Sequence, residues 1–381
     1  MNFRPTAPGL HPSRVHVASG SGGYDVLIAP ALIGALGQTL RSMGVGGRVA
    51  LVSDTTILKH WGAFATESLE AAGYSVSTIV LPPGEATKNL RGAEQLYGQL
   101  IREGFGRSDT VVAFGGGVVG DLAGFVAATY HRGMSLVHLP TTVLAQVDSS
   151  IGGKVAVDHP LGKNLIGAFH PPRAVICDPT LLKSLSLRER WSGLAEVVKA
   201  ALIADEQLVQ SLERDLDVIG NGLASEARVC EVVERAVRIK AAVVSSDEKE
   251  QGRRAILNFG HTLGHALEAV TGYGALTHGE AIVIGMRVAL EISAQLGHSS
   301  AADAARALAL LGRFPAPPPV SPPAREAVIA AARRDKKAEG GALRFVVLAG
   351  VGRAQVVPAI SDEMLALGVD RALDEFSETP R

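Results

Sequence analysis

Apolar runs alternate with amphipathic stretches through the first half of the chain. Short apolar runs predict strands at 48–53, 74–81, 110–114, 136–139, 154–157 and 174–177. Helical patterns lie between the first of these, over about 56–72, 85–103 and 115–129. Strands that are apolar throughout and alternate with helices are typical of a parallel sheet covered on both faces. The pattern therefore predicts an N-terminal α/β domain.

After about residue 185 the periodicity of apolar positions becomes helical. It covers 188–203, 227–245, 258–270, 279–296 and 301–311, and a Pro-rich segment at 314–323 leads to a short helix and a strand pair at 343–348 and 354–357. We therefore predict a disordered extension over 1–13, an α/β domain over 14–186 and a mostly α-helical domain over 187–381. A cleft between unlike domains is the usual place for a ligand.

Composition and charge exclude several classes of protein. The chain has 381 residues, enough for two domains with cores of their own, and its formal charge of −1 argues against an electrostatic nucleic-acid binder. Two cysteines, Cys177 and Cys230, rule out a disulfide framework and fit a reducing compartment. The longest uncharged stretches, 26–40 and 133–147, have fifteen residues each, short of the roughly 18 that span a membrane. We expect a cytoplasmic enzyme without a secretory signal.

A glycine-rich loop, GGGVVGD at 115–121, follows the third predicted strand and opens a helix. Glycines at a helix N-terminus let the backbone approach a pyrophosphate. The usual dinucleotide fingerprint has an acid about 20 residues further on, and none occurs between 130 and 147. Asp54, at the end of an earlier strand, is the acid that could hold a ribose instead. A tight strand–helix turn without a ligand is the alternative.

A second candidate turn, PPGEATK at 82–88, leads into the next helix. Glu85 could accept hydrogen bonds from ribose hydroxyls, and Lys88 could meet a phosphate. An ordinary helix start explains the same residues equally well.

Histidines and carboxylates are concentrated in the second half. The motif NFGHTLGH at 258–265 places His261 and His265 four residues apart on one helix face, and His278 follows in THGE. Glu196 lies on the helix over 188–203. Two imidazoles, one carboxylate and an open position are typical of a catalytic zinc site, although Thr262 excludes a HExxH protease. The spacing leaves open which of the three histidines bind the metal.

Lysines, an amide and an aspartate are concentrated in glycine-rich segments near the predicted domain boundary, at Asp148, Lys154, Lys163 and Asn164. Further cations are Arg132, Lys199, Lys240, Arg253, Arg254, Lys336 and Lys337. Such a set predicts a site for a small, multiply charged anion such as a phosphate or carboxylate. For any single lysine, a solvated surface position is the alternative.

Six motifs in chain order resemble the 3-dehydroquinate synthase family. They are GGVVGD at 116–121, PTTVLAQVDSSIGGK at 140–154, HPLGKNLIGAF at 159–169, GLAEVVK at 193–199, NFGHTLGH at 258–265 and HGEA at 278–281. The resemblance covers about residues 24–357. It implies a Rossmann-like N-terminal domain, a mostly α-helical C-terminal domain, bound NAD+, a divalent metal (Zn2+ or Co2+) and a homodimer that acts in the shikimate pathway towards chorismate and the aromatic amino acids.

The resemblance also implies a role for each candidate residue. Glu196, His261 and His278 match the metal positions, which leaves His265 for the substrate phosphate. The cofactor positions are Asp54, Glu85, Lys88, Gly116, Gly117, Val118, Val119, Gly120, Asp121, Thr141, Thr142, Lys154, Lys163, Leu181, Leu182, Lys183 and Ser184. The phosphate positions are Lys154, Asn164, Asn258, His265 and Lys336, together with Arg132, which would reach the active site of the neighbouring subunit. The carboxylate pair is Lys240 and Arg254, and the hydroxyl positions are Asp148, Lys199 and Glu250.

The reaction that the resemblance implies converts 3-deoxy-D-arabino-heptulosonate 7-phosphate to 3-dehydroquinate and phosphate. It runs through transient NAD-dependent oxidation, β-elimination of phosphate, re-reduction and intramolecular aldol closure. Ala200, Ala201 and Thr56 depart from common family residues, which we expect to affect affinity rather than reaction type. The alternatives are another sugar-phosphate cyclase and a metal-dependent alcohol or glycerol-phosphate dehydrogenase. A dehydrogenase would accumulate NADH, whereas a cyclase would not.

Overall fold

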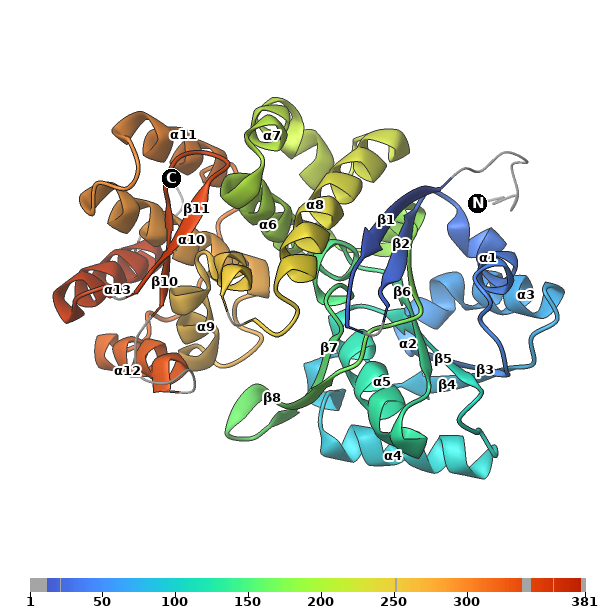
Figure 1. Cartoon of the computed structure of the whole chain (residues 1–381). Coiled ribbons are helices and arrows are strands. Elements are labelled where there is room, and N and C mark those ends of the chain that lie inside the picture. Colours follow the sequence, from blue (N-terminus) through green and yellow to red (C-terminus); the bar gives the residue numbers. More distant parts are fainter. Residues whose placement is uncertain (1–11, 21, 251, 338–343, 359, 378–381) are drawn as a thin grey trace. The chain divides into compact units, whose positions relative to one another are not determined.

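The computed structural model describes residues 12–20, 22–250, 252–337, 344–358 and 360–377 (Figure 1), with only the backbone described at 335–337 and 377. Of the predicted N-terminal extension, residues 1–11 lie outside this part, and Ser13 opens the first strand. Contacts divide the chain into two compact units, Met1–Ser186 with Ser225–Glu248, and Leu187–Ala224 with Lys249–Arg381. The domain ranges inferred from the sequence stay a prediction. In the structure, helix α8 (Glu226–Ser246) groups with the first unit.

A seven-stranded sheet, among the described residues, organises the first unit in the order β1-β2-β9-β6-β5-β3-β4. Its strands are β1 (Ser13–Val17), β2 (Tyr24–Ile28), β3 (Val49–Asp54), β4 (Val76–Leu81), β5 (Thr110–Gly115), β6 (Ser135–Pro140) and β9 (Ala174–Cys177). All neighbours run parallel except the edge pair β1–β2. The predicted Rossmann-like α/β fold is confirmed, and β1 and β2 extend the sheet beyond the strands that the sequence pattern gave.

Apolar cores cover both faces of this sheet, as the continuous apolar strands predict. Successive side chains of a strand point to opposite faces, so Val49 and Leu51 belong to one core and Ala50 and Val52 to the other. The first core is completed by α1 (Leu36–Ser42) and by a run of helix comprising α2 (Thr55–Ile57), η2 (Leu58–Gly62) and α3 (Ala63–Ala71). The second is completed by α4 (Leu90–Arg102) and α5 (Gly117–Thr129).

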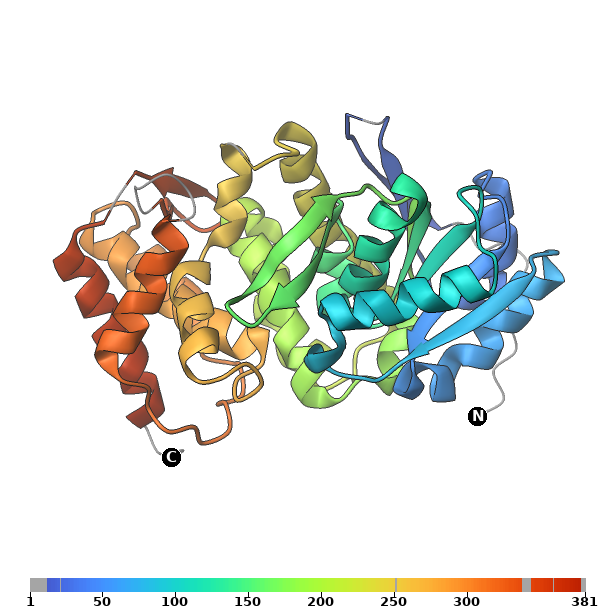
Figure 2. The same cartoon turned by 90° about the horizontal axis from the view of Figure 1, so that it is seen from below.

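The predicted strand at 154–157 does not join the large sheet. It forms β7 (Lys154–His159), which pairs antiparallel with β8 (Gly162–Phe169) in a two-stranded sheet of its own. Figure 2 shows this green hairpin beside α5. A Cβ atom at Gly124 of α5 would lie 2.3 Å from Val155 Cγ1, so the glycine permits this close packing. The hairpin is therefore anchored to α5 by the buried residues of β7.

The second unit is mostly α-helical, as predicted. Its elements are α6 (Leu187–Ala204), α7 (Glu206–Gly220), α9 (His261–Val270), α10 (His278–Gln295), α11 (Ala301–Leu311), α12 (Arg325–Lys337), α13 (Asp362–Ser377) and the hairpin of β10 (Phe345–Leu348) and β11 (Ala354–Val357). Helix α10 is central and packs against α6, α9, α11 and α13. In the part of the chain that the structure describes, no helix is long and apolar enough to cross a membrane.

Short helical turns connect these elements and carry several candidate residues. They are η1 (Leu32–Ala35), η3 (Glu85–Thr87), η4 (Tyr130–Arg132), η5 (Ala145–Ser149), η6 (Pro179–Ser184) and η7 (Arg253–Asn258). The helix predicted over 85–103 is therefore split, because α4 begins only at Leu90 after the Asn89 cap. Similarly, the helix predicted over 258–270 begins at His261, because Gly260 before it has a left-handed φ of 80°.

Candidate active site

The candidate cofactor residues of the first unit follow the carboxyl ends of the parallel strands. Asp54 closes β3, the glycine loop follows β5, and Thr141 and Thr142 follow β6. Glu85 and Lys88 follow β4, and residues 181–184 lie in η6 after β9. Strand β3 lies between β4 and β5 in the sheet. From β3 the chain first continues to β4 on one side and then to β5 on the other, so the strand order reverses between β3 and β5. Ligands of open α/β sheets bind at such a reversal.

The glycine loop meets the start of α5 without a side-chain cap. Gly116 is the N-cap residue, and no side chain bonds to the first-turn N–H groups from that position. A Cβ atom at Gly116 would lie 3.0 Å from Thr142 Cγ2, and one at Gly115 would lie 2.6 Å from Val119 Cγ2. Close packing therefore explains Gly115 and Gly116 even without a ligand. Thr141 Oγ1, buried beside the loop, has no hydrogen-bond partner among the described residues.

Lys88 is the centre of a buried polar network beside the loop. Its Nζ lies 2.6 Å from Asp121 Oδ2 and donates to Asn164 Oδ1 at 2.6 Å. Burial acts to lower the pKa of Lys88, but the neighbouring carboxylates, Asp121 first among them, raise it above the usual value. Lys88 therefore remains an ammonium group. Asn164 has a left-handed φ of 57°, and its N–H donates to Asp158 Oδ1 at 2.9 Å.

The other first-unit candidates make the following contacts. Lys163 Nζ lies 3.0 Å from Glu85 Oε1, which brings two of the predicted cofactor residues together. Lys240 of α8 donates to the backbone oxygen of Asp148 at 2.8 Å and to its Oδ1 at 2.5 Å. Lys154, at the start of β7, and Arg132, in η4, have exposed side chains. The network around Lys88 and the Lys240–Asp148 pair thus bring predicted residues together within this unit.

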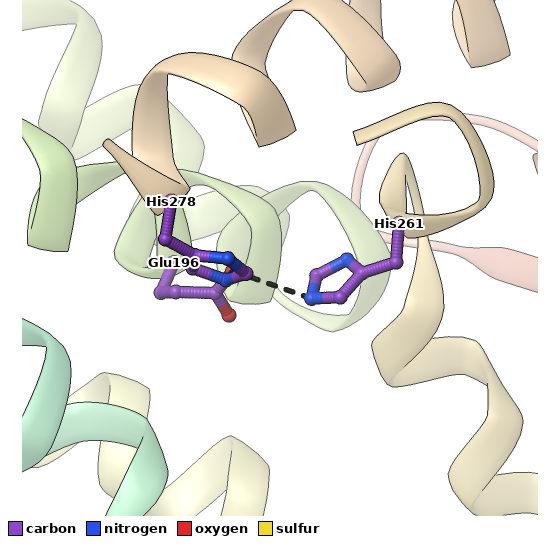
Figure 3. Close-up of side chains that lie close together, drawn as sticks. All are labelled: Glu196, His261 and His278. Atoms are coloured by element: carbon purple, nitrogen blue, oxygen red, sulfur yellow. Dashed lines mark ion pairs between the residues drawn. The ribbon is translucent and has the colours of Figure 1, made fainter. Parts of the chain in front are cut away.

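In the second unit, three side chains with metal-ligand chemistry converge (Figure 3). Glu196 comes from α6, and His261 and His278 are the first residues of α9 and α10. Glu196 Oε1 lies 3.5 Å from His278 Nε2 and 3.7 Å from His261 Nε2. The ligand atoms of all three residues lie within 4.8 Å of one another. The geometry thus groups Glu196 with two of the three histidines that the spacing alone could not separate.

His265 lies in a second, overlapping group with Glu268 and His278. Its ring centre is 5.0 Å from that of His261 and 6.0 Å from that of His278, and its side chain is exposed. Glu196, in contrast, has only 1% of its side chain exposed, and neither carboxylate oxygen has a hydrogen-bond partner of good geometry among the described residues. Lys199 Nζ forms an ion pair with its Oε2.

Burial and charge set the protonation of this cluster. Burial acts to raise the pKa of Glu196, but Lys199 and the two imidazoles hold it well below the usual range. Burial, followed by the charge of Lys199, lowers the pKa of His261 well below its usual value. Burial also acts to lower the pKa of His278, but the carboxylates of Glu196 and Glu268 beside its ring outweigh burial and raise the pKa to about 10. Glu196 is therefore an anion and His261 a neutral imidazole, the forms that bind metal, whereas His278 has to release a proton when it binds one.

The start of α10 is fixed by polar contacts. Thr277 and Glu280 form a capping box around His278. Arg188 of α6 donates to both oxygens of Glu280, at 2.8 and 2.7 Å. Because α6 also carries Glu196, this bidentate pair links the two helices that hold opposing members of the cluster.

Glycines bring the helices of the cluster close together. A Cβ atom at Gly279 would lie 2.1 Å from the backbone oxygen of Ser192 on α6, and one at Gly285 would lie 2.0 Å from the backbone oxygen of Gly260. The N–H of Gly279 also donates to Ser192 Oγ at 3.0 Å. Sequence alone gives these glycines no role, although Gly279 and Gly285 follow His278 by one and seven residues on α10, where glycine is unfavourable unless packing requires it.

We expect Gly279→Ala to separate α10 from α6. The new methyl group meets backbone atoms that cannot rotate away, so overpacking should destabilise the protein by about 1–3 kcal/mol. It should also weaken zinc binding, because His278 and Glu196 would move apart. Denaturant unfolding and chelator competition measure the two effects. Gly46→Ala is the control, because nothing lies within 4 Å of its Cβ position and its φ is not left-handed, so it adds a methyl group without a collision. Zinc affinity equally reduced in both variants would contradict the prediction.

Three further second-unit candidates, Glu250, Arg254 and Asn258, lie in or just before η7. Asn258 Nδ2 donates to Glu250 Oε1 at 3.2 Å, and Glu250 has a left-handed φ of 60°. Arg254 is buried in η7. The side chain of Lys336 lies outside the described part of the chain, so its predicted role stays a prediction.

Comparisons with known proteins converge on one family. Family models described as 3-dehydroquinate synthase N-terminal and C-terminal match residues 78–192 and 193–338. A curated 3-dehydroquinate synthase from Pelobacter propionicus is 46% identical over 91% of this chain and 96% of its own length. Many other curated relatives, such as that of Nostoc punctiforme at 44% identity, carry the same name.

Solved structures of related cyclases share the fold. A 2-deoxy-scyllo-inosose synthase complexed with carbaglucose-6-phosphate, NAD+ and Co2+ has a TM-score of 0.85 at 25% identity, covering 94% of this chain and 99% of that one. A 2-epi-5-epi-valiolone synthase from Streptomyces hygroscopicus, with NAD+ and Zn2+ bound, has a TM-score of 0.82 at 26% identity, covering 98% of this chain and 99% of its own.

Proposed function

The chain belongs to the 3-dehydroquinate synthase family, and from this membership we propose that it converts 3-deoxy-D-arabino-heptulosonate 7-phosphate to 3-dehydroquinate and phosphate. The observation that carries the proposal is the buried Glu196 carboxylate facing two imidazoles in a chain that matches both family domains. The two alternatives, another sugar-phosphate cyclase and a dehydrogenase, are not favoured, since the curated relatives carry the synthase name.

The residues present fit a divalent cation. Glu196 offers two buried oxygens without hydrogen bonds among the described residues, and His261 and His278 each turn Nε2 towards it. Two imidazoles and one carboxylate are a donor set that Zn2+ and Co2+ accept, with a position left for substrate. When bound, such a cation polarises a substrate hydroxyl as a Lewis acid. We assign Glu196, His261 and His278 to that role, with zinc as the resident ion.

The first unit fits a pyridine dinucleotide at the strand-order reversal. The Gly116 N-cap and the buried, unpartnered Thr141 Oγ1 suit a phosphate and its neighbouring oxygens. Asp54 accepts from the N–H groups of Thr56 and Ile57 through Oδ1, so its Oδ2 can accept from ribose hydroxyls. NAD+ bound here supplies a reversible hydride acceptor, and we assign the remaining cofactor positions of the family to the same cradle.

The chain's own polar residues hold the substrate. Lys154, Asn164, Asn258, His265 and Lys336 are assigned to the phosphate, which they would orient so that its own oxygen can take the neighbouring proton during elimination. Lys240 and Arg254 are assigned to the carboxylate, and Asp148, Lys199 and Glu250 to the hydroxyl groups. The buried Lys88 ammonium keeps Asn164 in place through its side-chain oxygen. We further propose a cytoplasmic homodimer in which Arg132 of each subunit reaches the neighbouring phosphate site.

A direct assay of the reaction products tests this function. Purified protein is incubated with the heptulosonate phosphate, NAD+ and Zn2+, and phosphate, 3-dehydroquinate and NADH are measured. We expect equal amounts of phosphate and 3-dehydroquinate with no net NADH. Stoichiometric NADH without phosphate release would overturn the assignment in favour of a dehydrogenase, and phosphate with a different carbocycle would overturn it in favour of another cyclase.

A further inference from the structure

Glu268 faces the side of His278 that is turned away from Glu196. It lies seven residues after His261 on α9, which places it on the same helix face two turns later. Its Oε2 is 3.2 Å from His278 Nδ1, while His278 Nε2 is 3.5 Å from Glu196 Oε1. The Glu268 side chain is 13% exposed, so water has limited access to this contact.

The contact fixes which ring nitrogen of His278 carries hydrogen. An ionised carboxylate can only accept a hydrogen bond, so the hydrogen lies on Nδ1. In the neutral ring this leaves the Nε2 lone pair directed at Glu196, where a cation would be held. His261 is oriented in the same way by a different acceptor, since its Nδ1 lies 3.2 Å from the backbone oxygen of Phe259.

We propose that Glu268 is a positioning residue that orients His278 for metal binding through the Nδ1–H···Oε2 hydrogen bond. The two imidazoles then differ in the group that accepts the hydrogen bond from Nδ1–H. His261 is held by a backbone carbonyl that no substitution can remove, and His278 is held by a carboxylate that also makes the imidazole more basic. This inference rests on the proposed metal site.

A second cation bound by His265, Glu268 and His278 is the competing interpretation of the same residues, because their ligand atoms also lie within 4.8 Å of one another. A cation there would need the Nδ1 lone pair of His278, and a cation beside Glu196 needs Nε2. A neutral imidazole has only one free lone pair, so full occupation of both places would require the ring to lose both hydrogens. Orientation by Glu268 needs no such ionisation.

The test compares E268A and E268Q with the unchanged chain after metal removal and titration with Co2+. Chelator competition gives the affinity, the visible spectrum reports the geometry around cobalt, and metal analysis gives the stoichiometry. For E268A we expect a 10- to 100-fold loss of cobalt affinity, the range typical of outer-shell substitutions, and an altered spectrum. E268Q keeps an oxygen acceptor for Nδ1–H and should recover most of the loss. Melting temperatures of the metal-free variants should stay within about 2 °C of the unchanged chain.

The matched control is E291Q on α10, which removes the same charge from the same unit at a residue that pairs with Arg371. It should leave cobalt affinity and spectrum unchanged. Unaltered cobalt binding in E268A, equal loss in E268A and E268Q, or two cobalt ions per chain with one lost in E268A would each overturn the inference. If the unchanged chain bound no cobalt, the proposed metal site itself would fail, which is a different result from normal binding by E268A.

Discussion

His278→Ala is expected to remove the metal ion and to lower kcat/KM by at least about a thousand-fold, the equivalent of roughly 4 kcal/mol of transition-state stabilisation. The substitution deletes one of three ligand-type side chains and leaves Glu196 facing His261 alone. Two remaining ligands cannot complete the tetrahedral shell that zinc adopts in such sites. Metal analysis after dialysis and the phosphate-release assay measure the two effects.

His298→Ala provides the control for this prediction. His298 belongs to the same unit, and its Nδ1 contacts Gln355 Nε2 at 2.6 Å on the exposed surface. Its loss should leave zinc content and activity close to those of the unchanged chain. A full equivalent of zinc in the His278→Ala protein would refute the ligand assignment, even if its activity were low.

Much of the first unit follows from local sequence because its strands are buried on both faces. Such strands read as continuous apolar runs, and four of the six predicted ones coincide closely with β3, β5, β6 and β9. Edge strands carry less of this signal. β1 alternates exposed and buried residues and lies at the edge of the sheet, so its pairing with β2 was not anticipated. Pairing partners at an edge depend on contacts distant in sequence, which periodicity does not report.

The hairpin of β7 and β8 shows a different limit. The apolar alternation of Val155 and Val157 predicts a strand correctly, but not the sheet it joins. Its placement depends on Gly124, whose missing side chain lets β7 approach α5. Helix α8 is a comparable case: its amphipathic pattern predicts a helix, but it belongs to the first unit because it contacts β1, β2, η5 and η6. Tertiary packing therefore determines which sheet β7 joins and which unit contains α8, and the local sequence pattern does not.

At the candidate site, the residues that could bind a metal were easier to predict than the residues that hold them in position. Two imidazoles on one helix face and a nearby carboxylate indicated a metal, but spacing could not rank the three histidines. The structure groups His261 and His278 with Glu196 because α9 and α10 both begin at the cluster. The glycines that let these helices approach, and Glu268 behind His278, act through close distances between segments. The spacing of residues along one sequence does not report distances between segments that are far apart in that sequence.

Lys199→Met is expected to destabilise the metal-free protein by about 3–5 kcal/mol, the usual effect of removing one partner from a buried ion pair. Lys199 and Glu196 are 3% and 1% exposed, so water cannot replace the lost ammonium group. The charge of Lys199 helps to hold the pKa of Glu196 well below its usual range. A lowered carboxyl pKa contributes stability above the unfolded value near 4.5, and this contribution is lost as the pH falls through the folded value. In the variant we therefore expect the Glu196 pKa to rise and acid unfolding to begin at higher pH.

Zinc should reverse much of this effect, because a cation bound by Glu196 replaces the missing positive charge and no longer meets repulsion from Lys199. The increase in melting temperature on adding zinc should therefore be larger for Lys199→Met than for the unchanged chain. Lys183→Met removes a lysine from an exposed pair with Glu226, where the partners are 55% and 44% exposed, and should change stability by less than about 1 kcal/mol. Equal zinc-induced shifts in the unchanged chain and Lys199→Met would show that Lys199 and the cation do not share the Glu196 carboxylate, and the charge-replacement argument would then fail.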